Sequence, residues 1–373
     1  MKYCTRCLMP DTRPNIKFSD GVCQGCLSYD RQKTTDWEKR WNELEKLCEK
    51  YRGKNGNDYD CIIAVSGGKD SHFQTYLIKE KLGMNPLLVS SGNIEWTEIG
   101  KKNLENISEA FGCDMIVSHP NRKIARKMMR KAFEEIGSPG WYLDSGLYSF
   151  PINMAMKLGI KLIFYGEDVN YTYGGEFSEE TPSAINQSKN DVVKPIWDQW
   201  FNDGEITERD LHSIKHPDEN EMKECKLEPI YLSYFVPWNS IHNFEVAKRW
   251  GFKHLGHEYE RESNLENFDQ IDSLSYLLNP SLKFQKYGHA MATDFASKMI
   301  RYGLKTRDEM NPFVEEHDGK LDQGVVEKFC DFTHMSIDEF YRILDKWYNT
   351  DLFEQDDHGV WHRKFKVGEG LNK

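Results

Sequence analysis

Between residues 60 and 165, short apolar runs alternate with longer helical stretches, and most of these stretches are followed by a glycine. Short, continuously apolar runs are typical of parallel strands buried on both faces, and glycine commonly ends a helix. The alternation predicts an α/β fold, a doubly wound parallel sheet with helices on both faces. The expected strands are 60–65, 87–90, 115–118 and 160–165, and the expected helices are 71–82, 98–111, 122–136 and 147–158.

The first expected strand leads directly into the sequence Ser-Gly-Gly-Lys-Asp-Ser at residues 66–71. Two adjacent glycines allow a sharp turn that brings backbone N–H groups close to an anion. Ser66 and Ser71 add hydroxyl donors, and the following helix directs its positive end to the same place. The spacing is not that of a Walker A loop. The segment predicts a phosphate or pyrophosphate cradle, with an ordinary glycine-rich turn as the alternative.

This loop resembles the signature of the N-type ATP pyrophosphatases, which include the tRNA lysidine and thiouridine synthetases, GMP synthetase and asparagine synthetase. The resemblance implies an adenine nucleotide alpha hydrolase-like fold and ATP and Mg²⁺ as cofactors. It gives Lys69 and Asp70 catalytic roles in balancing charge and holding the metal. The residues expected to contact ATP or pyrophosphate are Ala64, Val65, Ser66, Gly67, Gly68, Lys69, Asp70, Ser71, Ser91 and Gly166.

Four of the nine cysteines lie near the start of the chain, as two Cys-x2-Cys pairs separated by fifteen residues. This spacing is typical of a structural zinc site with four thiolate ligands. An iron–sulfur cluster or a redox pair is the alternative. The expected metal ligands are Cys4, Cys7, Cys23 and Cys26, and the remaining cysteines are expected to be ordinary thiols.

Acidic residues follow the fourth expected strand, where open α/β sheets place their ligands. Glu167 is predicted to act in catalysis, by binding magnesium or steering ammonia, and Asp168 to contact substrate. A solvated acidic loop is the alternative. The basic helix at 122–131 is interpreted as a solvated face, with RNA or nucleotide-sugar binding as a secondary reading. The aromatic segment 231–238 either stacks on sugars or bases or packs in the core.

The chain as a whole resembles the N-acetyl sugar amidotransferases, bacterial enzymes of lipopolysaccharide O-antigen and of pseudaminic- or legionaminic-acid pathways. The matching motifs are residues 4–14, the loop at 66, 164–167 with 173–175, 237–238, 292–294 and 300–303. Relatives often carry an arginine before the Ala-Thr-Asp motif, where this chain has Met291. The resemblance implies a sugar site that includes Asp168, Tyr173, Gly174, Gly175, Glu176, Trp238, Thr293, Asp294 and Arg301.

The resemblance implies a reaction in which the oxygen of an acetamido group attacks ATP and ammonia then displaces AMP, leaving an acetamidino group. The substrate would be an N-acetylated sugar or nucleotide sugar. Because Lys2 and Tyr3 precede Cys4, no N-terminal cysteine nucleophile is expected. Ammonia is therefore expected from separate glutaminase and ammonia-channel subunits like those of imidazole-glycerol-phosphate synthase.

Two other function classes stay open: a tRNA-modifying enzyme, and a non-catalytic subunit that binds nucleotide to control a glutaminase. The net charge of −11 argues against a large nucleic-acid partner. No apolar run approaches the ~20 residues that span a bilayer, so a cytoplasmic protein is expected. The expected units are a zinc ribbon at 1–33, a linker helix at 34–57, an ATP pyrophosphatase domain at 58–260 with a substrate-facing insertion at about 171–237, and a helical region at 261–373.

Overall fold

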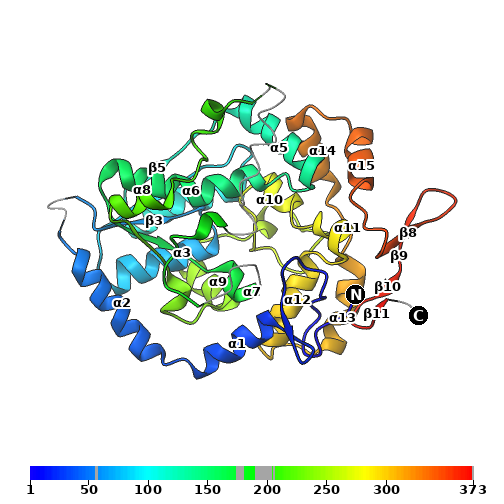
Figure 1. The fold of residues 1–373 in the computed structure, drawn as a ribbon, viewed down its shortest axis with the longest axis horizontal. Coiled ribbons are helices and arrows are strands. Elements are labelled where there is room, and N and C mark those ends of the chain that lie inside the picture. The colour runs from blue at the N-terminus through cyan, green and yellow to red at the C-terminus, as the bar shows by residue number, and fades with distance from the viewer. Residues whose placement is uncertain (55–57, 174–179, 190–203, 205, 372–373) are drawn as a thin grey trace.

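A five-stranded sheet, parallel throughout, lies at the centre of the molecule (Figure 1). The computed structural model describes residues 1–54, 58–173, 180–189, 204 and 206–371. The strand order is β5-β4-β3-β6-β7, and the predicted doubly wound α/β fold is confirmed. The strands are β3 (Cys61–Ala64), β4 (Pro86–Ser90), β5 (Met115–Val117), β6 (Leu162–Tyr165) and β7 (Glu228–Tyr231).

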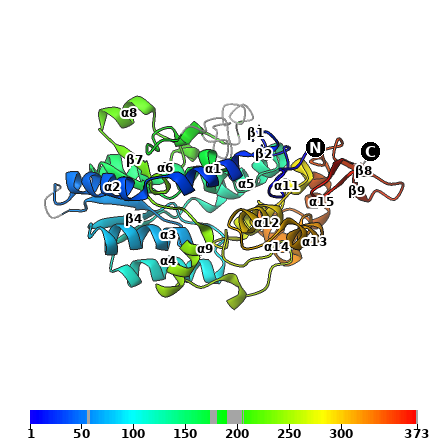
Figure 2. The same ribbon diagram turned by 90° about the horizontal axis from the view of Figure 1, so that it is seen from below.

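Both faces of the sheet are covered, because alternate residues of each strand enter different apolar clusters. Ile62 of β3 packs in a cluster with Ile152 of helix α6. Its neighbour Ile63 packs with Phe73 of α3 and Leu104 of α4. In Figure 2, α3, α4 and α9 lie on one side of the sheet and α6 on the other. These helices are α3 (Lys69–Thr75), α4 (Glu98–Phe111), α6 (Trp141–Leu158) and α9 (Ser240–Arg249).

The direction of winding changes between β3 and β6. Ile63 of β3 pairs with Leu88 of β4 on one side and with Phe164 of β6 on the other. The chain therefore builds outward from β3 in both directions. In an open α/β sheet, such a reversal opens a crevice at the carboxyl ends of the two strands, and this crevice is where ligands bind.

The C-terminal region forms a second helical core against α5. The rings of Phe133 in α5 and Phe340 in α15 stack with centroids 4.9 Å apart, and Figure 1 shows α5, α14 and α15 grouped together. The helices are α5 (Arg122–Ile136), α10 (Leu274–Leu278), α11 (Lys283–Tyr287), α12 (Met291–Arg301), α13 (Arg307–His317), α14 (Gln323–Thr333) and α15 (Ile337–Asp345).

The arginines of the basic helix α5 make contacts within the protein. Arg122, which is exposed, donates to the carbonyl of Ile94 at 2.8 Å, and Arg126 donates to the carbonyl of Phe332 at 2.6 Å. Arg130 forms an ion pair with Glu339 of α15. Arg126 and Arg130 are partly buried and link the C-terminal helices to α5, whereas Arg122 and Lys123 lie on the solvated face predicted from the sequence.

The cysteine-rich N-terminus packs against the C-terminal region, and the two chain ends lie close together in Figure 1. Arg307 of α13 donates to the carbonyls of Cys4 and Cys7, and to that of Gly368 at 3.1 Å. Leu8 packs in an apolar cluster with residues of α12 and α13. The N-terminal elements are β1 (Phe18–Ser19), β2 (Val22–Cys23), α1 (Gln24–Thr34) and α2 (Trp37–Tyr51).

Several elements differ from the sequence prediction. Helix α3 begins at Lys69 and passes into a π-helix, Tyr76–Lys81, and α6 begins at Trp141. Strand β7 lies inside the stretch predicted as an insertion. It is an edge strand of the sheet, and an edge strand can accommodate Pro229, which has no backbone N–H to donate. The domain boundaries themselves stay predictions. The remaining elements are α7 (Val169–Tyr173), α8 (Glu219–Glu224), β8 (Phe353–Gln355), β9 (Trp361–Arg363), β10 (Phe365–Lys366) and β11 (Gly370–Leu371), with short turns of 3-10 helix at Gln187–Lys189, Glu208–Leu211, Leu232–Tyr234 and Leu255–His257.

Among the described residues, every helix is either too short or too polar to cross a membrane.

Replacing Phe164 by alanine should lower the free energy of unfolding by about 3–5 kcal/mol, because the ring lies fully buried in β6. Urea denaturation measures the loss. Phe313→Ala is the matched control, since that ring on α13 is 48% exposed; its effect should stay within about 0.5 kcal/mol. Equal losses in the two variants would contradict the placement of β6 in the core.

Candidate functional site

A cavity of about 440 Å³ opens at the carboxyl ends of β3 and β6, where the sheet changes direction. Three parts of the chain line it. The sheet domain supplies residues 66–71 and Glu167, the N-terminal module supplies Arg13 and one face of α1, and the C-terminal region supplies residues between 264 and 302. The cavity therefore joins segments that are far apart in the sequence.

The loop after β3 makes a turn that only glycine permits. Gly67 has φ of +88°, and a Cβ placed there would lie 2.8 Å from the backbone of Leu104. The Ser66 N–H donates to Ser71 Oγ at 2.9 Å, and the Gly68 N–H donates to Ser66 Oγ at 3.3 Å. The two predicted serines thus hold the loop in shape as well as facing the cavity.

The buried residue His72 contacts the backbone of this loop. His72 Nδ1 lies 3.0 Å from the carbonyl oxygen of Gly68, and Nε2 lies 3.1 Å from the side-chain amide of Asn106. Burial lowers the pKa of His72 to about 4. The ring is neutral at pH 7, so it donates from Nδ1 and accepts at Nε2. His72 is a positioning residue that the sequence analysis missed.

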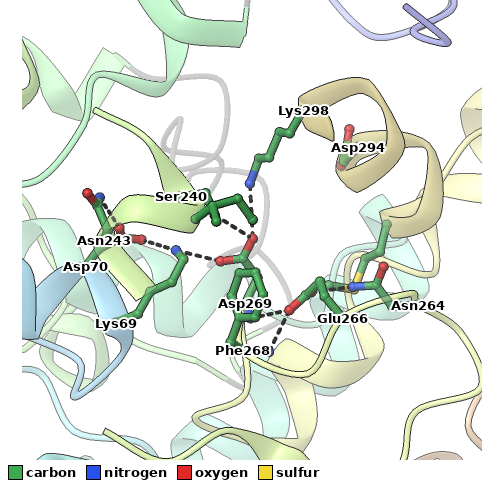
Figure 3. A network of polar contacts seen from close by, with 12 residues as sticks. Lys69, Asp70, Ser240, Asn243, Asn264, Glu266, Phe268, Asp269, Asp294 and Lys298 are labelled. Carbon is green, nitrogen blue, oxygen red and sulfur yellow. Dashed lines mark hydrogen bonds and ion pairs between the residues drawn. The ribbon is translucent and has the colours of Figure 1, made fainter. Parts of the chain in front are cut away.

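A chain of charges connects the loop to the C-terminal region (Figure 3). Lys69 Nζ lies 2.6 Å from Asp70 Oδ2 and 2.6 Å from Asp269 Oδ1. Lys298 of α12 reaches the other oxygen of Asp269 at 3.1 Å. Asn243 of α9 donates to Asp70 Oδ1 at 2.8 Å. One carboxylate, that of Asp269, therefore holds two ammonium groups at the wall of the cavity.

These contacts fix the charges of the network. Burial opposes the charge of Lys69, but the carboxylates of Asp269 and Asp70 raise its pKa above the ordinary lysine value. Burial likewise opposes the ionisation of Asp269, but Lys298 and Lys69 hold its pKa below the ordinary aspartate value. Lys69 and Asp269 are therefore ionised at pH 7.

Three further carboxyl groups of the cavity hold their protons more tightly than usual. Burial raises the pKa of Glu167 to about 7, and the nearby charge of Asp70 acts in the same direction. Burial also raises the pKa of Asp144 to about 7 and that of Asp272 to about 6. The Oε2 atom of Glu167 is buried without a hydrogen-bond partner. Buried polar atoms without a partner are costly, so this oxygen is available to a ligand.

The opposite wall of the cavity is basic. Arg13, Lys283 and Arg301 line it together with a single carboxylate, Asp294. Lys283 forms an ion pair with Asp294 Oδ2, and Arg13 Nη1 lies 3.9 Å from Oδ1 of the same residue. This part of the cavity therefore carries three cations, of which Lys283 and Arg13 lie close to Asp294.

The four predicted cysteine ligands come together in the N-terminal module. Their Sγ atoms all lie within 4.8 Å of one another, and all four residues are buried. The Cys4–Cys26 and Cys7–Cys23 sulfur separations are 3.9 and 3.6 Å. A tetrahedral ion with ~2.3 Å bonds to sulfur sets its ligands roughly 3.8 Å apart. The cluster therefore fits one tetrahedrally coordinated metal ion.

The structure brings most of the other predicted site residues to the cavity. Those lining it are Ser66, Gly68, Lys69, Asp70, Ser71, Glu167, Trp238, Asp294 and Arg301. Gly67 forms the turn itself, and Gly166 packs so closely that a Cβ would lie 3.0 Å from Gln74. Gly174, Gly175 and Glu176 lie outside the described residues, and Tyr173 is the last residue of α7.

Five predicted residues lie elsewhere. Ala64 and Val65 are buried within the sheet core. Ser91 lines a separate small pocket beside Gly146. Thr293 donates its hydroxyl to Asp318 and is buried outside the cavity. Asp168 accepts a hydrogen bond from the backbone of Tyr171.

The sequence analysis missed Asp269, Asp272, Lys283 and Lys298, although all four line the cavity. They lie beyond the alternating part of the chain, in a region predicted only as helical. A helical signal did exist on α12: Asp294, Lys298 and Arg301 are spaced four and three apart, so they share one face of the helix.

Met291, where relatives often carry arginine, also lines the cavity. The guanidinium of the buried Arg261 lies 2.8 Å from its sulfur atom. A cationic group is therefore present beside this position, although it comes from another part of the chain.

Part of the C-terminal region is similar to a known family. Residues 262–367 match the model described as the C-terminal domain of WbpG-like LPS biosynthesis proteins. This matched region supplies Asp269, Lys283, Lys298 and Arg301 to the cavity. The region that matches this family model thus forms one wall of the site, and the loop after β3 forms the other.

The chain has two further similarities to known proteins. The uncharacterized protein MJ1599 of Methanocaldococcus jannaschii is 30% identical over 183 residues, which are 43% of this chain. The match spans 65% of the relative's own length. The U34-tRNA thiolase NcsA from Methanococcus maripaludis, solved with its [4Fe-4S] cluster, aligns over 80% of this chain and 88% of its own. Its TM-score is 0.30 at 12% identity, which supports no conclusion about this chain.

Glu167 should make the stability of the protein fall as pH rises from about 4.5 to 7. Its pKa is about 7 when folded against an ordinary value of 4.5, so the folded chain binds the proton more tightly across this window. The stabilisation is full below pH 4.5 and is lost as pH rises through 7. Glu167→Gln should reduce this slope in urea titrations between pH 5 and 8.

Glu109→Gln is the control, because Glu109 is an exposed helical glutamate; its slope should equal that of the unmodified chain. A slope unchanged by Glu167→Gln would show that this carboxyl group is not desolvated.

Proposed function

We propose that this protein is an ATP-dependent amidotransferase that converts the acetamido group of a sugar or nucleotide sugar into an acetamidino group. The pathway would be that of a bacterial surface polysaccharide such as an O-antigen, or of a flagellin glycan. One observation carries the proposal: a single cavity joins the loop at residues 66–71 to the domain matched to LPS-biosynthesis proteins.

The loop end of the cavity suits the triphosphate of ATP with Mg²⁺. Besides Asp294, six carboxyl groups line the cavity, and the loop end holds two ammonium groups, Lys69 and Lys298; the carboxyl groups are Asp70, Asp144, Glu167, Glu266, Asp269 and Asp272. Among the described residues, no three carboxylates converge closely enough to form a metal site by themselves. Mg²⁺ commonly binds one or two carboxylates together with phosphate oxygens, which is what this arrangement supports. Lys69 and Lys298 would then neutralise phosphate charge.

The proposed reaction has two steps. The acetamido oxygen attacks the α-phosphorus of ATP, and pyrophosphate leaves, which gives an adenylated imidate. The nitrogen of ammonia then attacks the imidate carbon, loses a proton, and AMP leaves. Glu167 is suited to accept that proton, because its pKa lies near 7 and its Oε2 has no other partner.

Ammonia would come from separate glutaminase and channel subunits, as the family resemblance implies. Water is the competing nucleophile, since its attack on the imidate would consume ATP without product. The walls of the N-terminal module and of α12 would serve to limit access of water to the loop.

The net charge of −11 argues against the tRNA-modifying alternative. Of the basic residues of helix α5, on which this alternative relied together with the loop, Arg126 and Arg130 contact the carbonyl of Phe332 and the carboxylate of Glu339 within the protein.

Asp70→Asn and Ser66→Ala should each lower AMP formation by about 10²–10³-fold, because each removes a group that stabilises charge at the phosphate site. The assay incubates the protein with ATP, Mg²⁺, ammonium and N-acetylated sugar nucleotides, and measures AMP together with the sugar product by mass spectrometry. Exchange of oxygen for NH lowers the product mass by about 1 unit.

Asp308→Asn should leave the rate unchanged, because this aspartate is exposed on α13. AMP formed at the normal rate by both loop variants would remove the loop from the mechanism. Product formed from tRNA but from no sugar would replace the proposed substrate class.

The four-cysteine cluster should hold one zinc ion per chain. Cys23→Ser should release it and lower the midpoint of thermal unfolding, because structural zinc contributes directly to folding. Metal analysis and thermal unfolding check both effects. Cys225→Ser is the control, since Cys225 is exposed and lies away from the cluster. Iron instead of zinc, or zinc that survives Cys23→Ser, would contradict the assignment.

A further inference from the structure

Helix α1 of the cysteine module forms part of the cavity wall. Gly25, Ser28, Tyr29 and Gln32 all line the cavity, at helical spacing on one face of α1. The ring of Tyr29 lies 5.4 Å from that of Tyr302, which follows α12 and also lines the cavity. The N-terminal module therefore contributes side chains to the site in addition to its metal cluster.

Gly25 leaves room for the guanidinium of Arg301. A Cβ at Gly25 would lie 2.7 Å from Arg301 Nη1 and 3.3 Å from its Cζ. Gly25 lies in the first turn of α1, where alanine would be the better helix former. Glycine at this position costs helix stability, and the close approach of Arg301 provides a physical reason for its presence.

Ser28 offers a donor that the protein itself does not use. Its side chain is only 1% exposed, its Oγ has no hydrogen-bond partner, and it lines the cavity one turn after Gly25. A buried hydroxyl without a partner is costly unless a ligand or water satisfies it. Ser28 and Arg301 therefore present a hydroxyl and a cation at the same wall.

The two ends of the cavity differ in charge. Carboxyl groups outnumber ammonium groups around the loop, whereas Arg13, Lys283 and Arg301 line the cavity on the side of α1 and α12, where Asp294 pairs with Lys283. If the triphosphate and Mg²⁺ occupy the loop end, the acceptor has to occupy the remaining space, because its oxygen must reach the α-phosphorus. An acceptor with an anionic group matches the basic wall.

We propose that Gly25, Ser28 and Arg301 form a subsite that binds an anionic oxygen group of the acceptor, so that the cysteine module determines acceptor specificity. The inference rests on the proposed function for the identity of the acceptor. The anionic group is either a carboxylate of an acidic sugar or the diphosphate of a nucleotide sugar, and the two sources share the same hydrogen-bonding chemistry.

The test is calorimetric titration of the full chain and of the variants Gly25→Ala and Ser28→Ala. The probes are UDP-N-acetylglucosamine, UDP-N-acetylglucosaminuronate and free N-acetylneuraminate, and α,β-methylene-ATP with Mg²⁺ is titrated separately. Each variant should weaken binding of the recognised sugar probe about tenfold, as expected for one lost charge-assisted hydrogen bond. Binding of the ATP analogue should stay within twofold.

Matched controls separate the subsite from general effects. Gly324→Ala adds a methyl group in helix α14 where nothing lies within 4 Å. Ser149→Ala removes another buried hydroxyl that has no partner, in α6 and outside the cavity. Both should bind every probe as the unmodified chain does. Because Gly25 adjoins Cys26, metal content is measured for Gly25→Ala and should be unchanged.

The three probes identify the anion. Binding of both UDP sugars assigns the diphosphate, and binding of only the two acidic sugars assigns the carboxylate. Sugar binding that ignores both variants, variants that weaken the ATP analogue equally, or an unmodified chain that binds none of the sugars would overturn the inference. Sugar binding through these residues without any AMP or amidino product would overturn the proposed function and leave the subsite intact.

Discussion

The carboxylate of Asp269 is the contact on which the site depends. It lies between Lys69, at the start of α3, and Lys298, on α12, and pairs with both. Burial disfavours the charged form of a lysine, and the carboxylate of Asp269 offsets this effect at Lys69. Since Asp269 lies in the region matched to the WbpG-like domain, the charge of Lys69 in the loop after β3 is balanced by that region.

A second set of contacts holds the C-terminal region against the rest of the protein. Arginine side chains of α5 and α13 make these contacts. Arg126 of α5 binds a carbonyl of the C-terminal helices, and Arg307 of α13 binds carbonyls next to the cysteine cluster. The guanidinium group suits this role, because it stays charged and donates several hydrogen bonds in fixed directions. The cavity is thus bounded by three parts of the chain that contact one another, and α1 connects the cysteine cluster to the cavity wall.

The distribution of charge in the cavity would favour different ligand groups at its two ends. The loop end collects carboxyl groups, several with raised pKa values, and the α1–α12 end collects cations. Carboxyl groups that hold protons in the free protein can ionise when a divalent cation arrives, so Mg²⁺ and nucleotide at the proposed site would compensate their burial. Carboxyl groups with raised pKa values cluster at functional sites, and Glu167 is one of them.

The local pattern of the sequence determined the parallel sheet, the glycine turn at Gly67 and the four-cysteine cluster, because strand burial, left-handed backbone and metal spacing are all short-range properties. It did not reveal β7, whose four residues carry no clear pattern, nor the contacts of Arg126 and Arg130 on α5 with the C-terminal helices. Only the tertiary structure brought Asp269, Lys298 and Ser28 to the loop, since their roles arise from packing between segments about 40 to 230 residues apart. Local periodicity does not indicate which distant carboxylate will contact a given lysine. That contact depends on how the N-terminal module, the sheet and the C-terminal region pack together.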